Sequence, residues 1–288
     1  MANLKETRNR ITSIKSTMQI TSAMKMVSAA KLKRAQDAIT QMRPYAEKLQ
    51  EILVNLTAGS EDDGEGVYST VRPEEKVLVV AVTSNRGLCG GFNASITKKC
   101  LTLANGEYSS KNLSFLCVGK KGGEFLKNRG LNVVKTEIEL FNDLTFDNVA
   151  PIAEEVMAEF VAGSYDKVVL VYNQFRNAAV QEVQNEQFLP VVAQETDEVA
   201  NSTDYIYEPN KEDIVTELIP KSLKTQFYKA ILDSVAGEHG ARMTAMHKAT
   251  DNAKDLADRL TLEYNKARQA AITTEILEIV GGAEALKG

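Results

Sequence analysis

A heptad pattern runs through both ends of the chain, and it constrains the fold more than any other feature. From Leu4 to Leu56, positions spaced alternately three and four apart give 16 residues, of which 12 are apolar. From Leu232 to Leu277 the same spacing gives 14 positions, of which 10 are apolar and several are alanine. Such a repeat is typical of a helix that packs along a narrow seam, and small seam residues let two helix axes approach closely. We therefore expect an antiparallel coiled coil, with Pro44 kinking the first helix without ending it.

The residues between these helices predict a different kind of structure. Four short apolar segments have the composition of strands, and helical patterns follow the first three: residues 76–82, 113–118, 131–136 and 167–175. Alternation of strand and helix indicates a Rossmann-like α/β domain with a mostly parallel sheet, and residues 181–207 predict further strands. The predicted fold class is α/β plus α. The predicted domains are an N-terminal helix (1–57), a central α/β domain (58–208) and a C-terminal helix (209–288).

Several classes of protein are disfavoured by composition. The longest apolar runs, Val77–Val82 and Val168–Tyr172, have six and five residues, whereas a membrane-spanning helix needs roughly 20. The polar N-terminus does not resemble a signal peptide. Cys89, Cys100 and Cys117 show no CxxC spacing, so we expect buried, reduced thiols. His239 and His247, the two histidines, lack a metal-binding motif. We therefore expect no catalytic residue, no metal site and no cofactor.

Two glycine-containing segments, at 83–93 and 118–125, follow predicted strands, where a phosphate-binding loop would lie. In TSNRGLCGGFN, Cys89 stands where a dinucleotide fingerprint requires its second glycine. VGKKGGEF lacks the spacing of a P-loop. We interpret both segments as tight turns and contact surfaces, and we expect neither to bind a nucleotide.

Charge and hydropathy indicate that the long helices meet partners. Residues 1–57 hold ten basic and four acidic side chains, a net +6, which leaves −11 for the remainder of a chain whose net charge is −5. The first helix should therefore meet an acidic surface, of protein or nucleic acid. Residues 20–30 and 270–286 are apolar around more than one helical face. Because such a helix is stable in water only when it is surrounded, we expect a sleeve of partner proteins.

Longer motifs resemble those of the ATP synthase gamma chain family, from one end of the sequence to the other. They are AMKMVSAAKLKRAQ (23–36), RPYAEKL (43–49), SNRGLCGGFN (84–93), DYIYEP (204–209), ARMTAMHKATDNA (241–253) and YNKARQAAITTEILEIVGGAEA (264–285). The resemblance implies a non-catalytic rotor shaft. Its two terminal helices would turn inside a ring of three alpha and three beta subunits, and its α/β foot would contact the epsilon subunit and the c ring. It also implies a peripheral location on the cytoplasmic face of the cell membrane.

The resemblance also implies which residues touch partners. The positions implied for contact with the alpha/beta ring are Met24, Lys31, Lys33, Arg34, Cys89, Arg268, Gln269, Ile276, Ile279, Val280, Ala283 and Ala285. Those implied for contact with the epsilon subunit and the c ring are Tyr205, Tyr207 and Glu208. A thiol-regulated insert of the photosynthetic kind is not expected, because residues 191–204 contain no cysteine.

Two other classes of function are compatible with such residues: a coiled-coil protein that binds nucleic acid or acts as a scaffold, and a small-molecule enzyme. The basic first helix could bind nucleic acid with the coiled coil as a dimerisation device, but no aromatic residue interleaves with its basic residues before Tyr45. The α/β domain could be a small-molecule enzyme, but no acid/base pair and no nucleophile with a partner can be named. We therefore expect neither a nucleic acid nor a small-molecule substrate among the partners.

Overall fold

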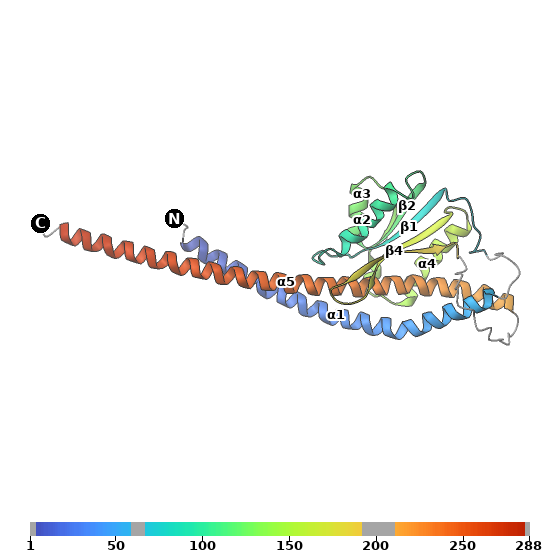
Figure 1. Cartoon of the computed structure of the whole chain (residues 1–288), viewed down its shortest axis with the longest axis horizontal. Helices are drawn as coiled ribbons and strands as arrows, with labels where there is room; N and C mark the ends of the chain where they lie inside the picture. Colours follow the sequence, from blue (N-terminus) through green and yellow to red (C-terminus); the bar gives the residue numbers. More distant parts are fainter. Residues whose placement is uncertain (1–3, 59–66, 192–210, 286–288) are drawn as a thin grey trace. The chain divides into compact units, whose positions relative to one another are not determined.

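The computed structural model describes residues 4–58, 67–191 and 211–285 (Figure 1). The chain forms two compact units, and two long helices, α1 (Leu4–Ala58) and α5 (Lys211–Ala285), contribute to both. The coiled-coil unit consists of Met1–Ser28 and Met243–Gly288, and the sheet unit consists of Ala29–Arg242. The predicted first boundary lies at the end of α1, and residue 208 lies outside the described residues. The compact units divide each long helix, α1 after Ser28 and α5 after Arg242.

In the coiled-coil unit, α1 and α5 run antiparallel, so that the first turns of α1 and the last turns of α5 point toward the same end of the unit (Figure 1). The predicted seam positions in this unit's part of α1, from Leu4 to Ser28, are half-buried or buried, and Thr21 is one of the buried ones. Its hydroxyl lies 2.8 Å from the hydroxyl of Thr250 on α5. Apolar seam residues of α5, such as Leu260, are buried as well. The paired helices confirm the predicted coiled coil.

The seam on α5 ends where α1 begins. Leu4 lies 17 residues before Thr21, and the residue 17 positions after Thr250 is Ala267. Ala267 is the last half-buried residue of α5, and every residue from 268 to 285 is exposed. We call residues 268–285 the C-terminal extension. The heptad pattern continues into this extension as far as Leu277, although no segment of α1 lies beside it.

The sheet unit is built on five strands in the order β3-β2-β1-β4-β5. The strands are β1 (Lys76–Val82), β2 (Asn112–Val118), β3 (Val133–Glu137), β4 (Lys167–Phe175) and β5 (Gln181–Leu189). Neighbouring strands are parallel except for β4 and β5, which form an antiparallel pair. The apolar run of β1 is buried on both faces, as is typical of a parallel sheet covered by helices. The four predicted strands and the mostly parallel sheet are confirmed, and β5 lies within residues 181–207, of which 192–207 are outside the described residues.

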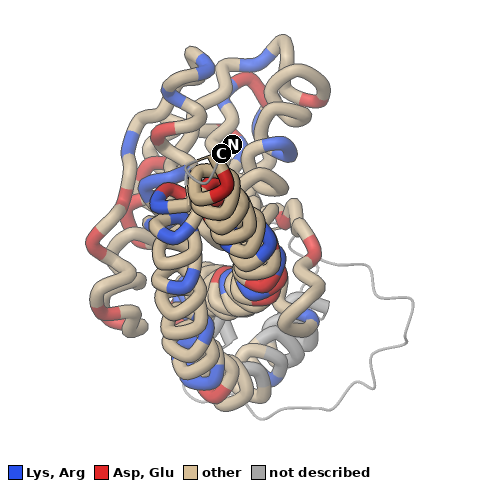
Figure 2. Tube along the Cα trace, turned by 90° about the vertical axis from the view of Figure 1, so that its left-hand side faces the viewer, with Lys and Arg blue, Asp and Glu red and all other residues tan. Residues whose placement is uncertain are grey.

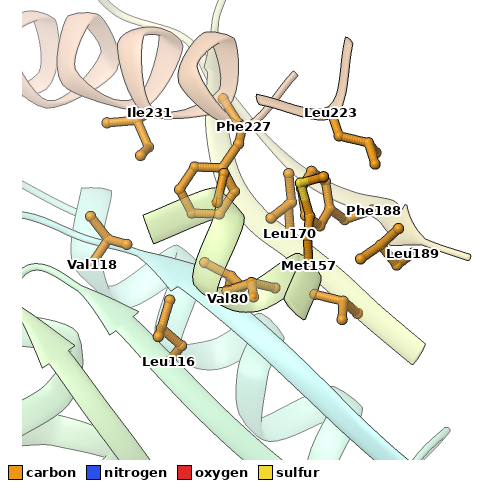
Figure 3. Packing of buried hydrophobic residues seen from close by; sticks show 14 of the residues in the cluster. Val80, Leu116, Val118, Met157, Leu170, Phe188, Leu189, Leu223, Phe227 and Ile231 are labelled. Carbon is orange, nitrogen blue, oxygen red and sulfur yellow. The ribbon is translucent and has the colours of Figure 1, made fainter. Parts of the chain in front are cut away.

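Helices cover both faces of the sheet. One core cluster contains residues of α2 (Phe92–Asn105) and α3 (Lys120–Asn128), and the other contains residues of α4 (Phe146–Val161) and α5. A short 3-10 helix, η1 (Glu139–Phe141), precedes α4. Figure 3 shows Phe227 and Ile231 of α5 above the sheet residue Leu170, with Phe188 close by. The Phe227 and Phe188 rings lie 5.6 Å apart. The first part of α5 is therefore a core helix of the α/β unit, which is why the compact units divide this helix.

The two long helices continue through residues that usually weaken helices. Pro44 lies inside α1 and Pro220 lies inside α5. Gly237 and Gly240 of α5 serve close packing: a Cβ on Gly237 would lie 3.2 Å from a side-chain carbon of Gln181, and one on Gly240 would lie 3.1 Å from the Cα of Ala178. These glycines let the β4–β5 hairpin approach the α5 backbone.

Candidate interaction surfaces

The start of α3 is a helix N-terminus that follows a strand, where a phosphate could bind, but three of its amides already donate to groups of the chain itself. The Lys120 amide donates to Asn85 Oδ1 at 2.9 Å, and the Gly122 amide donates to Thr83 Oγ1 at 2.9 Å. The Lys121 amide donates to the Ser84 carbonyl at 3.1 Å. An anion at a helix N-terminus binds through such amides. The chain thus uses its own strand-end residues in place of a phosphate.

The glycines of this segment are explained by packing rather than by ligand binding. Gly119 has φ +110°, and a Cβ there would lie 2.2 Å from the Thr83 carbonyl oxygen. A Cβ on Gly122 would lie 2.6 Å from Thr83 Oγ1, and one on Gly123 would lie 2.7 Å from Thr136 Oγ1. Because real Cβ atoms almost never come so close, a side chain at Gly119 is excluded by the Thr83 backbone, and one at Gly122 or Gly123 would force Thr83 or Thr136 to shift. The interpretation of this segment as a tight turn therefore has a steric basis.

The loop formed by residues 84–91 also has a fixed internal structure. The Ser84 amide donates to Asn93 Oδ1 at 3.0 Å, and the Asn93 side-chain amide donates to Cys89 Sγ at 3.3 Å. Cys89 is only 2% exposed, whereas its neighbour Leu88 is 63% exposed and has φ +63°. Cys89 was predicted to contact the alpha/beta ring. If a partner docks at this position, Leu88 offers the accessible side chain.

Arg242 of α5 donates hydrogen bonds to two backbone carbonyls of this loop. Its Nη2 donates to the Arg86 carbonyl at 2.9 Å and its Nε donates to the Gly87 carbonyl at 3.3 Å. Its Nη1 donates to Glu238 Oε1 at 2.6 Å in an ion pair whose two side chains are about nine-tenths buried. Burial raises the pKa of Glu238, and the charge of Arg242 opposes that shift. The neighbouring His239 has its pKa lowered to about 4, because burial and then the Arg242 charge both disfavour the imidazolium.

Sequence reasoning placed His239 and Arg242 in the seam and missed this role. A signal was present, because charged or polar residues at consecutive seam positions are costly unless they have partners. The presence of Glu238 four residues before Arg242 could have indicated an ion pair on one helical face. Nothing in the sequence indicated that the other partners would be carbonyl groups of residues 86 and 87, about 155 positions away.

The C-terminal extension carries apolar side chains exposed to solvent. Ile276, Ile279 and Val280 are 54%, 66% and 51% exposed, and Ala283 and Ala285 are exposed too. Arg268 and Gln269, at the start of the extension, are likewise exposed. All seven were predicted to touch partner subunits, and the structure leaves all seven accessible.

A second exposed apolar surface lies on α1. Ile20, Met26 and Val27 are each more than half exposed, while Met24 is half-buried. This surface is followed by the basic residues Lys31, Lys33 and Arg34, all exposed. Figure 2 marks the Lys and Arg positions of both long helices in blue. Lys33 pairs with Asp37 of the same helix at 2.7 Å, so that its charge is partly neutralised within the chain.

Tyr205, Tyr207 and Glu208 lie outside the described residues. All three cysteines are free and buried, and burial raises the pKa of Cys100 and of Cys117 to about 12. Among the described residues, no group of three or more His, Cys, Asp or Glu side chains could hold a metal ion. No helix in the described ranges is long and apolar enough to span a membrane.

Comparison with known proteins agrees with this combination of features. A family model described as ATP synthase matches residues 3–286. The ATP synthase gamma chain of Flavobacterium psychrophilum is 62% identical over 288 residues, and that of Geobacter metallireducens is 48% identical over 291 aligned positions; each alignment covers 100% of both chains.

Solved structures give the same result. A chain of the Tetrahymena thermophila mitochondrial ATP synthase central stalk and c-ring is 28% identical, with a TM-score of 0.59 over 80% of this chain and 99% of that one. A chain of the Euglena gracilis mitochondrial ATP synthase rotor, 21% identical, has a TM-score of 0.68 over 93% of this chain and 98% of that one, which shows a shared fold. With relatives this similar over their whole length, the chain belongs to the ATP synthase gamma chain family.

Proposed function

We propose that this chain is the central stalk of a rotary ATP synthase and carries torque between an ion-driven membrane ring and a catalytic ring of three alpha and three beta subunits. The observation that carries the proposal is the C-terminal extension, which continues past Leu4, the first residue of α1, with its apolar side chains exposed. A helix of this composition is stable when other proteins surround it. The alpha/beta ring supplies such a sleeve.

Torque transfer needs no reactive group on the stalk. A shaft with different side chains on its different faces presents a different surface to each of three otherwise equivalent catalytic subunits. Each catalytic subunit is thereby biased toward a different conformation and a different nucleotide affinity, and rotation exchanges these surfaces. The amides at the start of α3 are occupied by the chain's own groups, which fits a subunit that leaves nucleotide chemistry to its partners.

The basic residues Lys31, Lys33 and Arg34 suit an acidic partner segment on the alpha/beta ring. Their side chains are exposed, so each ion pair would contribute only about 0.2–1 kcal/mol, and the fit of the whole helix matters more than any single pair. We assign the foot contacts with the epsilon subunit and the c ring to the region of Tyr205, Tyr207 and Glu208. The stalk is then a peripheral protein at the cytoplasmic face of the membrane.

The experiment reverses the charge of the basic cluster. Lys31, Lys33 and Arg34 are replaced together by glutamate, and in a matched variant by alanine, and the chain is mixed with alpha and beta subunits at low and high salt. The glutamate variant should recover less alpha and beta at low salt, where screening is weakest, and the alanine variant should be close to wild type.

The outcome also tests the nucleic-acid alternative. That reading predicts a steeply salt-dependent binding to DNA or RNA that both variants abolish, with no effect on the recovery of alpha and beta. Equal recovery of both subunits by all three proteins at every salt concentration would contradict the electrostatic part of the proposal.

A further inference from the structure

The sheet unit contains a cavity of about 270 Å³ beside α5, on the side of this helix that faces away from the sheet. Leu223 and Phe227 contact the sheet core, and Thr225, which lines the cavity, lies about 160° around the helix from both. An apolar cavity of about 150 Å³ already holds a benzene ring, so this one has room for a ring with a short substituent. Residues of α1, α4 and α5 line it: Met42, Tyr45, Phe146, Lys221, Thr225 and Tyr228.

The walls of the cavity suit a flat apolar group. The rings of Phe146, the first residue of α4, and Tyr228 pack edge to face with their centroids 5.7 Å apart. Met42 has a flexible thioether side chain that adapts its shape to a neighbouring ring. Tyr45 is 48% exposed, so the cavity is open to solvent beside α1. A further aromatic ring can therefore enter and pack against the Phe146 and Tyr228 pair.

Thr225 places a polar group inside the cavity that the described structure leaves unpaired. The residue is 3% exposed, and its hydroxyl has no hydrogen-bond partner among the described residues. Thr250 and Thr261 of the same helix instead donate to the carbonyl four residues earlier, at 2.8 and 2.7 Å. Because an unpaired buried hydroxyl is costly, a ligand that supplies a partner gains affinity. The Thr225 hydroxyl is thus a recognition point within an apolar site.

Lys221 supplies a positive charge one helical turn before Thr225. Its side chain is exposed and forms no ion pair within the described part of the chain, whereas Lys224, outside the cavity, pairs with Glu154 at 2.9 Å. Four residues of helix span roughly 6 Å, and the flexible lysine stem adds reach. A ligand that meets both residues therefore needs an anionic group at one end and a hydrogen-bonding group at the other.

We propose that this cavity is a binding site for a small aromatic carboxylate with a hydroxyl group at the far end of its ring. The carboxylate pairs with Lys221 at the opening, the ring packs against Phe146 and Tyr228, and the ligand hydroxyl forms a hydrogen bond with Thr225 Oγ1. All the lining residues belong to the sheet unit. The site is a property of the chain by itself, so it does not depend on the proposed function.

Binding is tested with the full, isolated chain and para-hydroxyphenylacetate as the probe. The chain has eight methionines, and isotope labelling of their methyl groups makes each visible by NMR. The Met42 resonance, identified with Met42→Leu, should shift and saturate with a Kd of about 1 mM or lower. Met246, which is buried in the coiled-coil unit, serves as an internal reference and should not shift.

Two variants test the recognition of the ligand. Wild type should bind the hydroxylated acid about three- to ten-fold more tightly than phenylacetate, and Thr225→Val should bind the two acids equally. Lys221→Gln should weaken the binding of both acids about two- to five-fold, because an exposed ion pair is lost. Lys224→Gln, a matched change outside the cavity, should bind like wild type.

Thermal unfolding tests the unpaired hydroxyl without any ligand. Thr225→Val should unfold at or above the wild-type temperature, because valine keeps the shape and removes an unpaired polar group. Thr97→Val should unfold at a lower temperature, because Thr97 is buried and its hydroxyl donates to the Asn93 carbonyl at 3.0 Å. An equal loss of stability in both variants would mean that the Thr225 hydroxyl is bonded within the chain, which overturns its role.

The binding data can overturn the proposal in three ways. Absence of a saturable Met42 shift with either acid at millimolar concentrations would exclude the site. Equal affinity of wild type for the two acids would exclude recognition by Thr225. Wild-type affinity in Lys221→Gln would exclude a carboxylate as the anionic group that the site selects.

Discussion

The apolar side chains of the C-terminal extension should contribute to assembly and not to the stability of the isolated chain. The perturbation is the simultaneous replacement of Ile276, Ile279 and Val280 by serine. Full burial of such a side chain is worth about 1.5–3 kcal/mol, and roughly half of each remains to be buried by a partner. Because serine keeps its Cβ, the triple change should cost about 3 kcal/mol of binding, which is about a hundred-fold in affinity.

The thermal stability of the isolated chain should depend on the buried core of α5 and not on the exposed residues of the C-terminal extension. The triple serine variant should unfold at the wild-type temperature, because these side chains make no buried contacts in the described structure. Phe227→Ala, on the same helix, should lower the free energy of unfolding by about 3–5 kcal/mol, because Phe227 is buried in the sheet core. Val134→Ser supplies a matched control, since Val134 is also half exposed but lies on the edge strand β3.

The assay compares thermal unfolding of each isolated variant with its affinity for purified alpha and beta subunits. The reasoning would be refuted if the serine variant lost thermal stability to a similar extent as Phe227→Ala. It would equally be refuted if the serine variant bound the ring as tightly as the Val134→Ser control.

Three further predictions concern the sheet unit. Folding lowers the pKa of His239 from an ordinary 6.5 to about 4, so the contribution of His239 to the free energy of unfolding should be complete above about pH 6.5 and smaller by about 1–2 kcal/mol at pH 5. His239→Gln should remove this decline in denaturant titrations at acid pH. The same dependence of the free energy of unfolding on pH in His239→Gln and wild type would exclude His239 as its source. Gly122→Ala should lower the stability by about 1–3 kcal/mol, since its Cβ would press on Thr83, and a wild-type melting temperature would contradict the steric argument. The isolated chain should show no ATP binding at micromolar concentrations by calorimetry, because the α3 amides are already paired; measurable heat of binding would show that they can be released.

The pattern of the long helices could be predicted from sequence because each position depends mainly on local periodicity. The three-and-four spacing identified the less exposed positions of α1 from Leu4 to Leu49, and the composition of residues 270–286 indicated a surface that the structure leaves exposed over 270–285. The sequence alone could not show that the first part of α5 packs on the sheet while a later part packs on α1. Leu223, Phe227 and Ile231 contact the sheet, but a helix that packs on a sheet and a helix that packs on another helix have the same periodicity.

The loop chemistry was beyond sequence reasoning for a different reason. The glycines at 119, 122 and 123 suggested a ligand, and only the close approach of Thr83 and Thr136 shows that packing requires them. The partners of Arg242 are backbone carbonyls, which every residue has, so no side-chain pattern could identify them. The left-handed backbone at Leu88 is likewise set by these long-range contacts.

The transmission of torque is tested most directly by watching the chain turn. A visible probe is attached through Ser110→Cys, at an exposed position of the sheet unit, where selective labelling is possible because the native cysteines are buried. The chain is assembled with alpha and beta subunits fixed to a surface, and ATP is added. The account predicts rotation in one direction, with one step for each of the three catalytic subunits. ATP hydrolysis by the assembled ring while the probe stays still would contradict it.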